Sequence, residues 1–356
     1  MDSNLDFVQV AKIKVIGVGG GGCNAVARMA KEGVRGVDFY VANTDAQILK
    51  GIEIDNKIIL GRELTHGLGA GGNPEVGRKA ALETEEEIKE ALTGANMVFI
   101  AAGMGGGTGT GAAPVVAKIS RELGALTVGV VTSPFTFEGP KVLNQAKSGL
   151  AELRENVDSI IVVSNDRLLD AIGRKPMSEA FREADNVLRQ GVQTITDLIA
   201  IPAFINLDFA DVSSVMKGRG SALIGIGMSD GENKAEEAAL RAISSPLLDV
   251  SIAGAKDAIV NVTGGSNITL YDANTALATI REAVGNDVNT VLGVAINDQL
   301  DDQVIVTVIA TGFEAEEEPT PVQKTTPSYE SPVKPSVYDI QDDDDDVPAF
   351  LRNRKL

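Results

Sequence analysis

Three glycine-rich segments and one pair of aspartates are the parts of this sequence whose residue types and spacing could do chemistry. The glycine-rich segments are 17–22, 67–74 and 103–111, and the aspartates are Asp208 and Asp211. Glycine allows the main chain to approach a phosphate, and a helix that follows such a loop offers unpaired N–H groups to the anion. Carboxylates can orient a water molecule for attack on phosphorus. Together these features indicate a protein that binds a polyphosphate and could hydrolyse it.

The first two segments differ in how strongly they indicate a phosphate. The segment 17–22 matches the pattern G-x-G-x-x-G before a predicted helix over 23–31, which fits either a dinucleotide-binding turn or a tight turn between strand and helix. In the segment 103–111, six of nine residues are glycine and two threonines add hydroxyl groups. Because it lies between an apolar strand and a predicted helix over 112–123, we interpret it as a phosphate-binding loop.

The third segment, 67–74, also precedes a predicted helix. Loops at the carboxyl ends of neighbouring parallel strands meet at one edge of a sheet, so we expect all three to converge on one polyphosphate. The sequence contains no Gly-Lys-Ser or Gly-Lys-Thr, which excludes a Walker-type P-loop. A dinucleotide-binding enzyme of Rossmann type would need only the first loop, so the other two argue against that alternative.

The two aspartates allow two interpretations. Asp208 and Asp211 are three residues apart, which places both carboxylates on one side of a helical turn. The pair could polarise a water molecule near a phosphate. Asp208 could equally cap a short helix that begins at Phe209, because aspartate is preferred at that position.

The elements that must position these residues alternate between apolar strands and helices over about 11–175. Six strands are predicted from continuously apolar segments, at 13–17, 39–43, 57–60, 97–102, 126–131 and 159–163. Helices between them imply right-handed crossovers and a mostly parallel, Rossmann-like α/β sheet. The region 11–175 is therefore expected to be the nucleotide-binding domain.

A long helix and a smaller domain follow this sheet. Apolar residues recur every three or four positions over 177–199, which predicts a long helix within a central segment 176–203. The region 204–312 alternates strands and helices and is expected to form a smaller α+β domain. Its last two strands, 290–296 and 303–310, flank a polar connection that predicts a hairpin.

The composition restricts the classes of function. The formal net charge is −18, from 32 basic and 50 acidic residues, so nucleic acid and anionic membranes are not expected as direct ligands. The N-terminus lacks the apolar core of a signal peptide, and no apolar run approaches the roughly 18 residues of a membrane span. With Cys23 as the single cysteine, we expect a cytoplasmic protein without an intramolecular disulfide.

The last part of the sequence has a different composition. The segment 313–346 holds 11 acidic residues against two lysines, together with many proline, serine and threonine residues. Such a segment cannot bury a core, and we expect a disordered acidic linker. The segment 347–356 regains apolar residues and carries three basic ones. An apolar and basic peptide after an acidic linker is typical of a short motif that folds on a partner.

Several segments resemble the tubulin and FtsZ superfamily, and within it the FtsZ family. Gly-Gly-Gly-Thr-Gly-Thr-Gly at 105–111 resembles the signature loop of the superfamily. Further motifs similar to FtsZ lie at 19–25, 43–45, 134–139, 206–212 and 347–352. The resemblance covers about 11–312 and resumes at 347. It implies a filament-forming GTPase that builds the division ring at the site of septation.

The resemblance also implies which residues hold GTP or GDP. The phosphates would be contacted by Gly20, Gly21, Gly107, Thr108 and Gly109, and the γ-phosphate would lie near Ala70, Gly71 and Gly72. Guanine would be read by Asn24, Asn165 and Asp185, with Phe181 packed on the base. Glu138 would accept hydrogen bonds from the ribose, and Asn43, Gly103 and Gly106 complete the binding set. From the residues alone, Phe181 and Asp185 are equally well explained as ordinary members of the long helix.

In this family, hydrolysis would depend on Asp208 and Asp211, supported by Asn206, acting on the nucleotide of the next subunit. Such a head-to-tail contact between copies of the chain does not close and therefore generates a filament. Magnesium would be held mainly through the phosphates, without a dedicated metal site. One position departs from the family, because Val142 stands where FtsZ usually carries an arginine near the phosphates. We therefore expect weaker γ-phosphate engagement or slower turnover.

The family's terminal peptide docks on membrane adaptors and division regulators. In this chain the contacts would come from Val347, Pro348, Phe350, Leu351 and Arg352, at the mid-cell division site. Two apolar anchors are too few for direct membrane insertion. Two other functions remain as alternatives: a nucleotide-dependent metabolic enzyme of Rossmann type, and a scaffold that binds GTP without hydrolysing it.

Overall fold

The computed structural model describes residues 11–173, 176–200, 203–205, 207–245, 251–285 and 287–313. These ranges belong to one compact unit, Met1–Glu314. Within them, no helix combines the length and the apolar character that a membrane span requires. The expectations for the linker beyond Phe313 and for the peptide 347–356 concern residues outside the described part of the chain, and they stay predictions.

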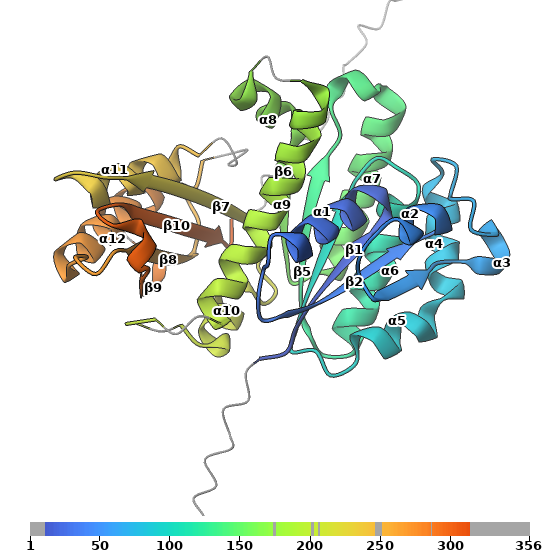
Figure 1. The fold of residues 1–356 in the computed structure, drawn as a ribbon, viewed down its shortest axis with the longest axis horizontal. Coiled ribbons are helices and arrows are strands. Elements are labelled where there is room, and N and C mark those ends of the chain that lie inside the picture. Colours follow the sequence, from blue (N-terminus) through green and yellow to red (C-terminus); the bar gives the residue numbers. More distant parts are fainter. Residues whose placement is uncertain are drawn as a thin grey trace, which may run out of the picture. The chain divides into compact units, whose positions relative to one another are not determined.

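Six parallel strands form the sheet that the sequence predicts (Figure 1). In chain order they are β1 (Ile13–Val18), β2 (Val37–Asn43), β3 (Asn56–Ile59), β4 (Met97–Gly103), β5 (Leu126–Ser133) and β6 (Ser159–Ser164). Their spatial order is β3-β2-β1-β4-β5-β6, and every neighbouring pair is parallel. The chain leaves the neighbours β1 and β4 toward opposite flanks of the sheet. Ligands of such sheets bind outside the carboxyl ends of the strands where the order reverses.

Helices cover both faces of the parallel sheet. One face packs against α1 (Gly19–Lys31) and α9 (Met177–Ala200). The other face packs against α4 (Pro74–Glu83), α5 (Glu85–Leu92), α6 (Thr108–Glu122) and α7 (Pro140–Asn156). Alternate residues of a strand point to opposite faces of the sheet. Val15 therefore packs in the core under α1 and α9, and its neighbour Ile16 packs in the core under α4 to α7. Burial on both faces explains why the strands read as continuous apolar runs.

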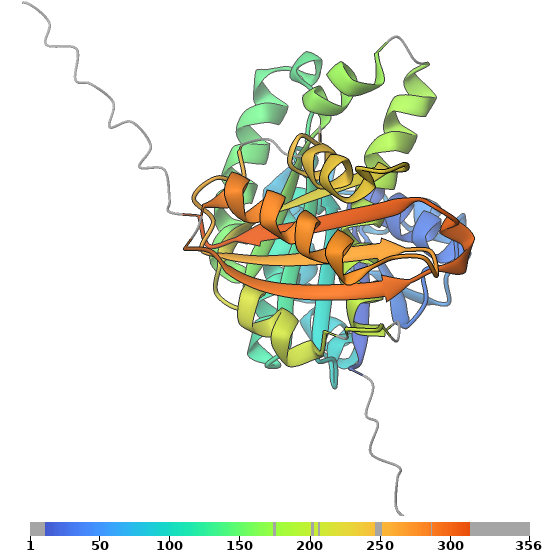
Figure 2. The ribbon, with the colours of Figure 1, turned by 90° about the vertical axis from the view of Figure 1, so that its left-hand side faces the viewer.

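Helix α9 leads into a second group of elements built on a mixed sheet (Figure 2). The elements are α10 (Phe209–Met216), β7 (Gly220–Ser229), α11 (Lys234–Ile243), β8 (Asp257–Gly264), α12 (Leu270–Val284), β9 (Asn289–Ile296) and β10 (Val304–Thr311). β7 joins the parallel sheet beside β6 through Gly220 and Ser221 alone, and the order continues as β7-β10-β8-β9. Helices α11 and α12 share one apolar core with this sheet.

The predicted hairpin between the last two strands is wrong. β9 runs antiparallel to β10 as expected, but β8 lies between them and pairs with both. The polar connection contains a short 3₁₀ turn, Asp298–Leu300, and carries the chain past β8. Turn residues signal that the chain reverses direction, but they do not determine which strand becomes the neighbour.

Two predicted helices begin earlier than the sequence pattern indicates. Helix α1 starts at Gly19 rather than at Cys23, and α6 starts at Thr108 rather than at Ala112. The low helix propensity of glycine hid these first turns, which are kept by packing. The third glycine segment follows a short helix, α3 (Arg62–Thr65), instead of leaving a strand directly.

The glycine-rich start of α6 packs tightly on α4. A Cβ placed on Gly111 would lie 1.9 Å from the carbonyl oxygen of Pro74, so Gly111→Ala should lower the free energy of unfolding by about 1–3 kcal/mol. Denaturant unfolding of the full chain measures this. Gly51→Ala is the matched control, because Gly51 has a helical φ of −79° and its nearest heavy atom would lie 3.6 Å from the new Cβ. Equal stability of the two variants would contradict the packing role.

Candidate functional site

The first turns of α1 and α6 meet at the carboxyl edge of the parallel sheet. Gly19 is the first residue of α1, and a Cβ placed on it would lie 2.7 Å from the nitrogen of Gly109 in α6. Its φ of +73° also favours glycine. The N-termini of both helices therefore point to the same place beside β1 and β4. Their unpaired N–H groups and their dipoles favour an anion there.

The third glycine segment reaches the same place through the start of α4. A Cβ placed on Gly107 would lie 2.8 Å from the Asn73 nitrogen and 2.9 Å from the Ala70 Cβ. Asn73 caps α4 by accepting a hydrogen bond from the Glu75 nitrogen at 3.0 Å. The hydroxyls of Thr108 and Thr44 are 2.7 Å apart and link α6 to the end of β2. The three glycine segments thus converge, with three helix N-termini around one point.

The glycines at this edge serve two purposes. Gly107 and Gly109 are required for packing, because a Cβ on Gly109 would lie 2.5 Å from the Gly103 carbonyl oxygen. At Gly71, Gly72 and Gly106, by contrast, a Cβ would meet no heavy atom within 4 Å, and at Gly20 the nearest would be 3.9 Å away. The main chain at these open positions is accessible to a ligand, whereas the packed positions can offer only their N–H groups.

Three buried polar atoms near these loops have no hydrogen-bond partner within the described part of the chain: Asn43 Nδ2, Asn165 Oδ1 and Arg28 Nε. Leaving a buried donor or acceptor unpaired costs about 1–3 kcal/mol, so such atoms normally have partners. Asn43 ends β2, and Asn165 begins α8 (Asn165–Ile172) directly after β6. Four strand spacings, or about 19 Å, separate these two strands. The separation fits an elongated polar ligand lying along the carboxyl edge.

Asp185 on α9 approaches α1 beside Arg28. The Arg28 Nη2 atom lies 3.4 Å from Asp185 Oδ2. Burial raises the pKa of Asp185 to about 6, although the positive charge of Arg28 acts in the opposite direction. Asn24 is exposed one helical turn before Arg28, on the same helix. Sequence reasoning missed Arg28, and its spacing of four residues from Asn24 is the only signal that could have found it.

The connection after β5 is held against the start of α8. Glu138 Oε1 accepts a hydrogen bond from the Phe135 nitrogen at 2.9 Å, within the 3₁₀ turn Thr136–Glu138. The Thr136 nitrogen donates to Asp166 Oδ1 at 3.0 Å, which holds the 3₁₀ turn against the first turn of α8 at the carboxyl edge. The ring of Phe137 stacks on that of Phe135 with centroids 4.9 Å apart, and Phe137 is exposed.

Two of the predicted site residues fall outside what can be described. Phe181 lies in α9, but its side chain is outside the described part of the structure, and Asn206 is outside it altogether. Their roles stay predictions.

Asp208 and Asp211 form a reciprocal capping box at the start of α10. Asp208 Oδ1 accepts a hydrogen bond from the Asp211 nitrogen at 2.8 Å, and Asp211 Oδ2 accepts one from the Asp208 nitrogen at 3.1 Å. The capping interpretation of Asp208 is therefore confirmed. The box uses one oxygen of each carboxylate, so capping does not exclude a second role for the pair.

The two acids lie at the opposite edge of the sheet from the glycine segments. The Ser159 hydroxyl donates to the Met216 carbonyl oxygen at 2.5 Å, which fixes the end of α10 beside the first residue of β6. In Figure 1, α10 accordingly lies at the end of α9 away from α8. The six residues of β6 span about 20 Å. Asp208 and Asp211, at the start of the short helix α10, therefore lie away from the carboxyl edge of their own chain.

The chain matches two protein-family models. Residues 12–173 match the Tubulin/FtsZ family GTPase domain, and residues 220–314 match the FtsZ family C-terminal domain. Among solved structures, it is similar to an FtsZ dimer from M. jannaschii, with 45% identity, 85% of this chain and 88% of that chain covered, and a TM-score of 0.80. It shares its fold with CetZ2 from Haloferax volcanii in a GTPγS-bound protofilament, at 22% identity, with 86% and 94% of the two chains covered and a TM-score of 0.74.

Proposed function

The chain belongs to the tubulin/FtsZ family and is a GTPase, and we propose that it assembles with GTP into head-to-tail filaments that form the division ring. GTP is hydrolysed where two subunits meet. The observation that carries this proposal is that the glycine segments and the acidic pair Asp208 and Asp211 lie at opposite edges of one sheet.

The phosphates of GTP lie where the N-termini of α1, α4 and α6 converge. The open main chain at Gly20 and Gly106, the exposed main chain at Gly21, and the N–H groups of Gly107, Thr108 and Gly109 offer hydrogen bonds in place of water. Asn43 Nδ2, which has no acceptor among the described residues, supports this position, because a phosphate oxygen would supply one. Ala70 packs beside Gly107, which supports a contact of Ala70, Gly71 and Gly72 with the γ-phosphate.

The guanosine lies toward α9 and α8. The Asp185 carboxylate accepts hydrogen bonds from N1–H and the 2-amino group of guanine, a pair of donors that adenine lacks. Asn165 Oδ1 has no donor within the described ranges, and the base can supply one. Exposed Asn24 is the third residue that contacts the guanine edge. Glu138 keeps Oε2 outside its bond to Phe135 and accepts from the ribose hydroxyls.

Magnesium is the ion that GTP would bring to this site. Within the described residues, no group of three or more histidine, cysteine, aspartate or glutamate side chains could hold a metal ion. In nucleotide sites, magnesium is usually held through substrate phosphates and water, with few protein ligands. When bound, the ion neutralises negative charge on the β- and γ-phosphates.

A second copy of the chain completes the active site. Its Asp208 and Asp211 orient the attacking water, with Asn206 in support, while the first copy holds the nucleotide. Exposed apolar residues stand at both edges and support such a contact: Leu68 and Phe137 beside the glycine segments, and Phe204 four residues before Asp208. Because the two edges differ, the contact repeats without closing and gives a filament.

The division ring places the filaments in the cytoplasm at mid-cell. The peptide with Val347, Pro348, Phe350, Leu351 and Arg352 tethers them to a membrane adaptor or a division regulator. Its composition, apolar and basic after an acidic linker, supports that role.

Guanine recognition by Asp185 should depend on pH. Above about pH 6 the carboxyl group is ionised and accepts both guanine donors, and as the pH falls through 6 it gains a proton and loses that capacity. The affinity for GDP, measured by calorimetry, should therefore fall about tenfold between pH 7 and pH 5. Asp185→Asn should bind more weakly and show a flatter profile. A constant affinity of the parent chain over this range would contradict the assignment.

Asp208→Asn should lower GTP turnover at least tenfold at concentrations that support filaments, because the variant loses a charge that polarises water. Asparagine still caps α10, so the free energy of unfolding should hardly change, whereas Asp208→Ala should lose about 1 kcal/mol with the cap. Phosphate release and denaturant unfolding measure the two effects separately. Turnover of Asp208→Asn at the parent rate, with filaments intact, would argue that the acid has only a capping role.

Val142→Arg should raise the turnover rate several-fold. Val142 packs against Gly105 in the phosphate loop, since its Cγ1 lies 2.6 Å from a Cβ placed on that glycine. An arginine at this point would bring a forked guanidinium group to the phosphates. The exposed Lys141 can offer only a point charge in its place. An unchanged hydrolysis rate would show that the departure from the family pattern has no effect on turnover.

A further inference from the structure

The loop Ala70, Gly71 and Gly72 is the least restrained part of the phosphate edge. Its start is fixed because the Gly69 nitrogen donates to the Thr44 carbonyl oxygen at 3.1 Å, and its end is fixed by the cap of α4. Between these points the Asn73 nitrogen donates to the Ala70 carbonyl oxygen at 3.0 Å and closes a turn, in which Gly71 and Gly72 have φ angles of +59° and +71° and no heavy atom within 4 Å of a Cβ position. Two adjacent glycines have a large conformational entropy, so a contact from outside the turn adds to the restraint on its shape.

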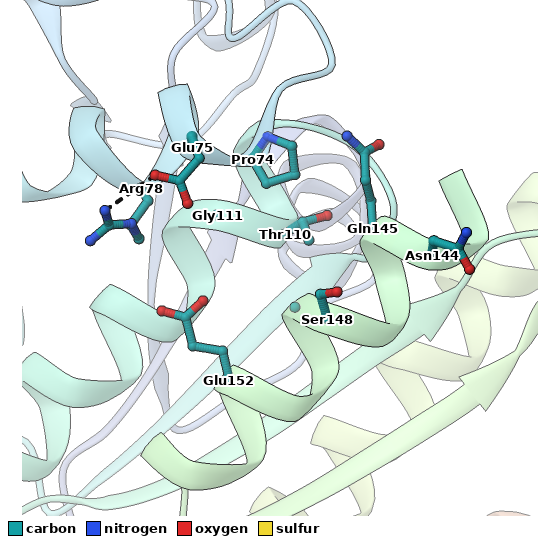
Figure 3. A pocket seen from close by; sticks show the side chains of 10 residues that line it. Pro74, Glu75, Arg78, Thr110, Gly111, Asn144, Gln145, Ser148 and Glu152 are labelled. Carbon is teal, nitrogen blue, oxygen red and sulfur yellow. Dashed lines mark hydrogen bonds and ion pairs between the residues drawn. The ribbon is translucent and has the colours of Figure 1, made fainter. Parts of the chain in front are cut away.

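One side chain supplies that contact. Gln145 Nε2 donates a hydrogen bond to the Gly72 carbonyl oxygen at 3.2 Å. Of the side chains described, no other forms a hydrogen bond with residues 70–72. In Figure 3 the amide of Gln145 extends from its helix beside Pro74. Pro74 is the residue that follows the loop 70–72 and the cap residue Asn73.

Helix α7 gives Gln145 a fixed base. Val142, Gln145 and Gly149 are spaced by three and four residues and lie on one face of this helix. Val142 packs on Gly105, and Gly149 abuts Thr110, whose methyl group would lie 2.3 Å from a Cβ on that glycine. The same face therefore supports the start of α6 by packing and the loop 70–72 by a hydrogen bond.

The amide of Gln145 also has room to move. It lines a cavity of about 280 Å³ between α4, α6 and α7, together with Glu75, Asn144, Ser148 and Glu152 (Figure 3). Polar side chains around the cavity can bond water, so the amide is not confined to Gly72 by packing. The hydrogen bond can therefore form and break with the shape of the loop.

We propose that Gln145 is a positioning residue that holds the Gly71 and Gly72 main chain in the shape that receives the γ-phosphate. The inference rests on the proposed binding of GTP at this edge. Gln145 acts through the Gly72 carbonyl oxygen and does not touch the nucleotide. Its loss should therefore weaken the binding of GTP and leave GDP almost unaffected, since GDP has no group at the loop.

The test compares affinities for GDP and for a slowly hydrolysed GTP analogue, with the full chain below its assembly concentration. Gln145→Glu keeps the length of the side chain but replaces the donor by an acceptor. It should reduce the affinity for the analogue about two- to tenfold relative to that for GDP. Gln145→Met, which has no charge and no donor, should change the ratio in the same direction. Gln145→Lys restores a donor and should return the ratio toward that of the parent.

Asn144→Asp is the matched control. It makes the same change from amide to carboxylate one residue away, lines the same cavity, and adds the same negative charge without a bond to the loop. Its affinity ratio should stay at the parent value. An equal ratio for Gln145→Glu and Asn144→Asp, or an equal loss of both nucleotides in Gln145→Met, would overturn the inference and leave the proposed function intact. Failure of the parent chain to bind GTP would contradict the proposed function itself, and this inference with it.

Discussion

Three helix N-termini are brought within contact distance at one edge of the parallel sheet, and the rest of the structure depends on that approach. It requires glycine, because a Cβ at Gly19, Gly107 or Gly111 would collide with the main chain of a neighbouring helix or loop. The reversal of strand order between β1 and β4 sends α1 and α6 to opposite faces while their first turns stay together. The converging dipoles favour a polyphosphate at this edge. Within the described part of the chain, Asn43 Nδ2 and Asn165 Oδ1, at the carboxyl ends of β2 and β6, have no hydrogen-bond partner.

This arrangement separates binding from hydrolysis. The parallel strands hold the phosphate edge and the capped helix α10 about 20 Å apart, so one chain carries two incomplete halves of the proposed active site. In the proposed function, a second copy that supplies Asp208 and Asp211 would complete the site, and such a contact would couple hydrolysis to assembly. Helix α9 carries Asp185 in its first half, and α10 follows its C-terminal end. In the proposed function, one long helix therefore connects the guanine-binding residue Asp185 to the acidic pair.

Much of this could be predicted from the sequence, because the signals were local. Continuous apolar runs gave the parallel strands, the three-to-four-residue periodicity gave α9, and glycine composition after strands indicated phosphate binding. What the sequence could not supply depends on contacts between distant residues. The pairing of β10 with β8 instead of β9 is decided by the whole sheet, and the ion pair of Arg28 with Asp185 joins two helices far apart in the chain. The first turns of α1 and α6 were missed because tertiary packing overrides the poor helix propensity of glycine there.

The central claim is that the complete catalytic site exists only between two copies of the chain. It is tested most directly by GTP turnover per chain, measured against total protein concentration at saturating GTP. A shared site predicts negligible turnover at low concentration and a steep rise above the concentration at which filaments appear by light scattering. Turnover per chain that is constant across the whole range would show that each chain hydrolyses GTP alone, and would contradict the account.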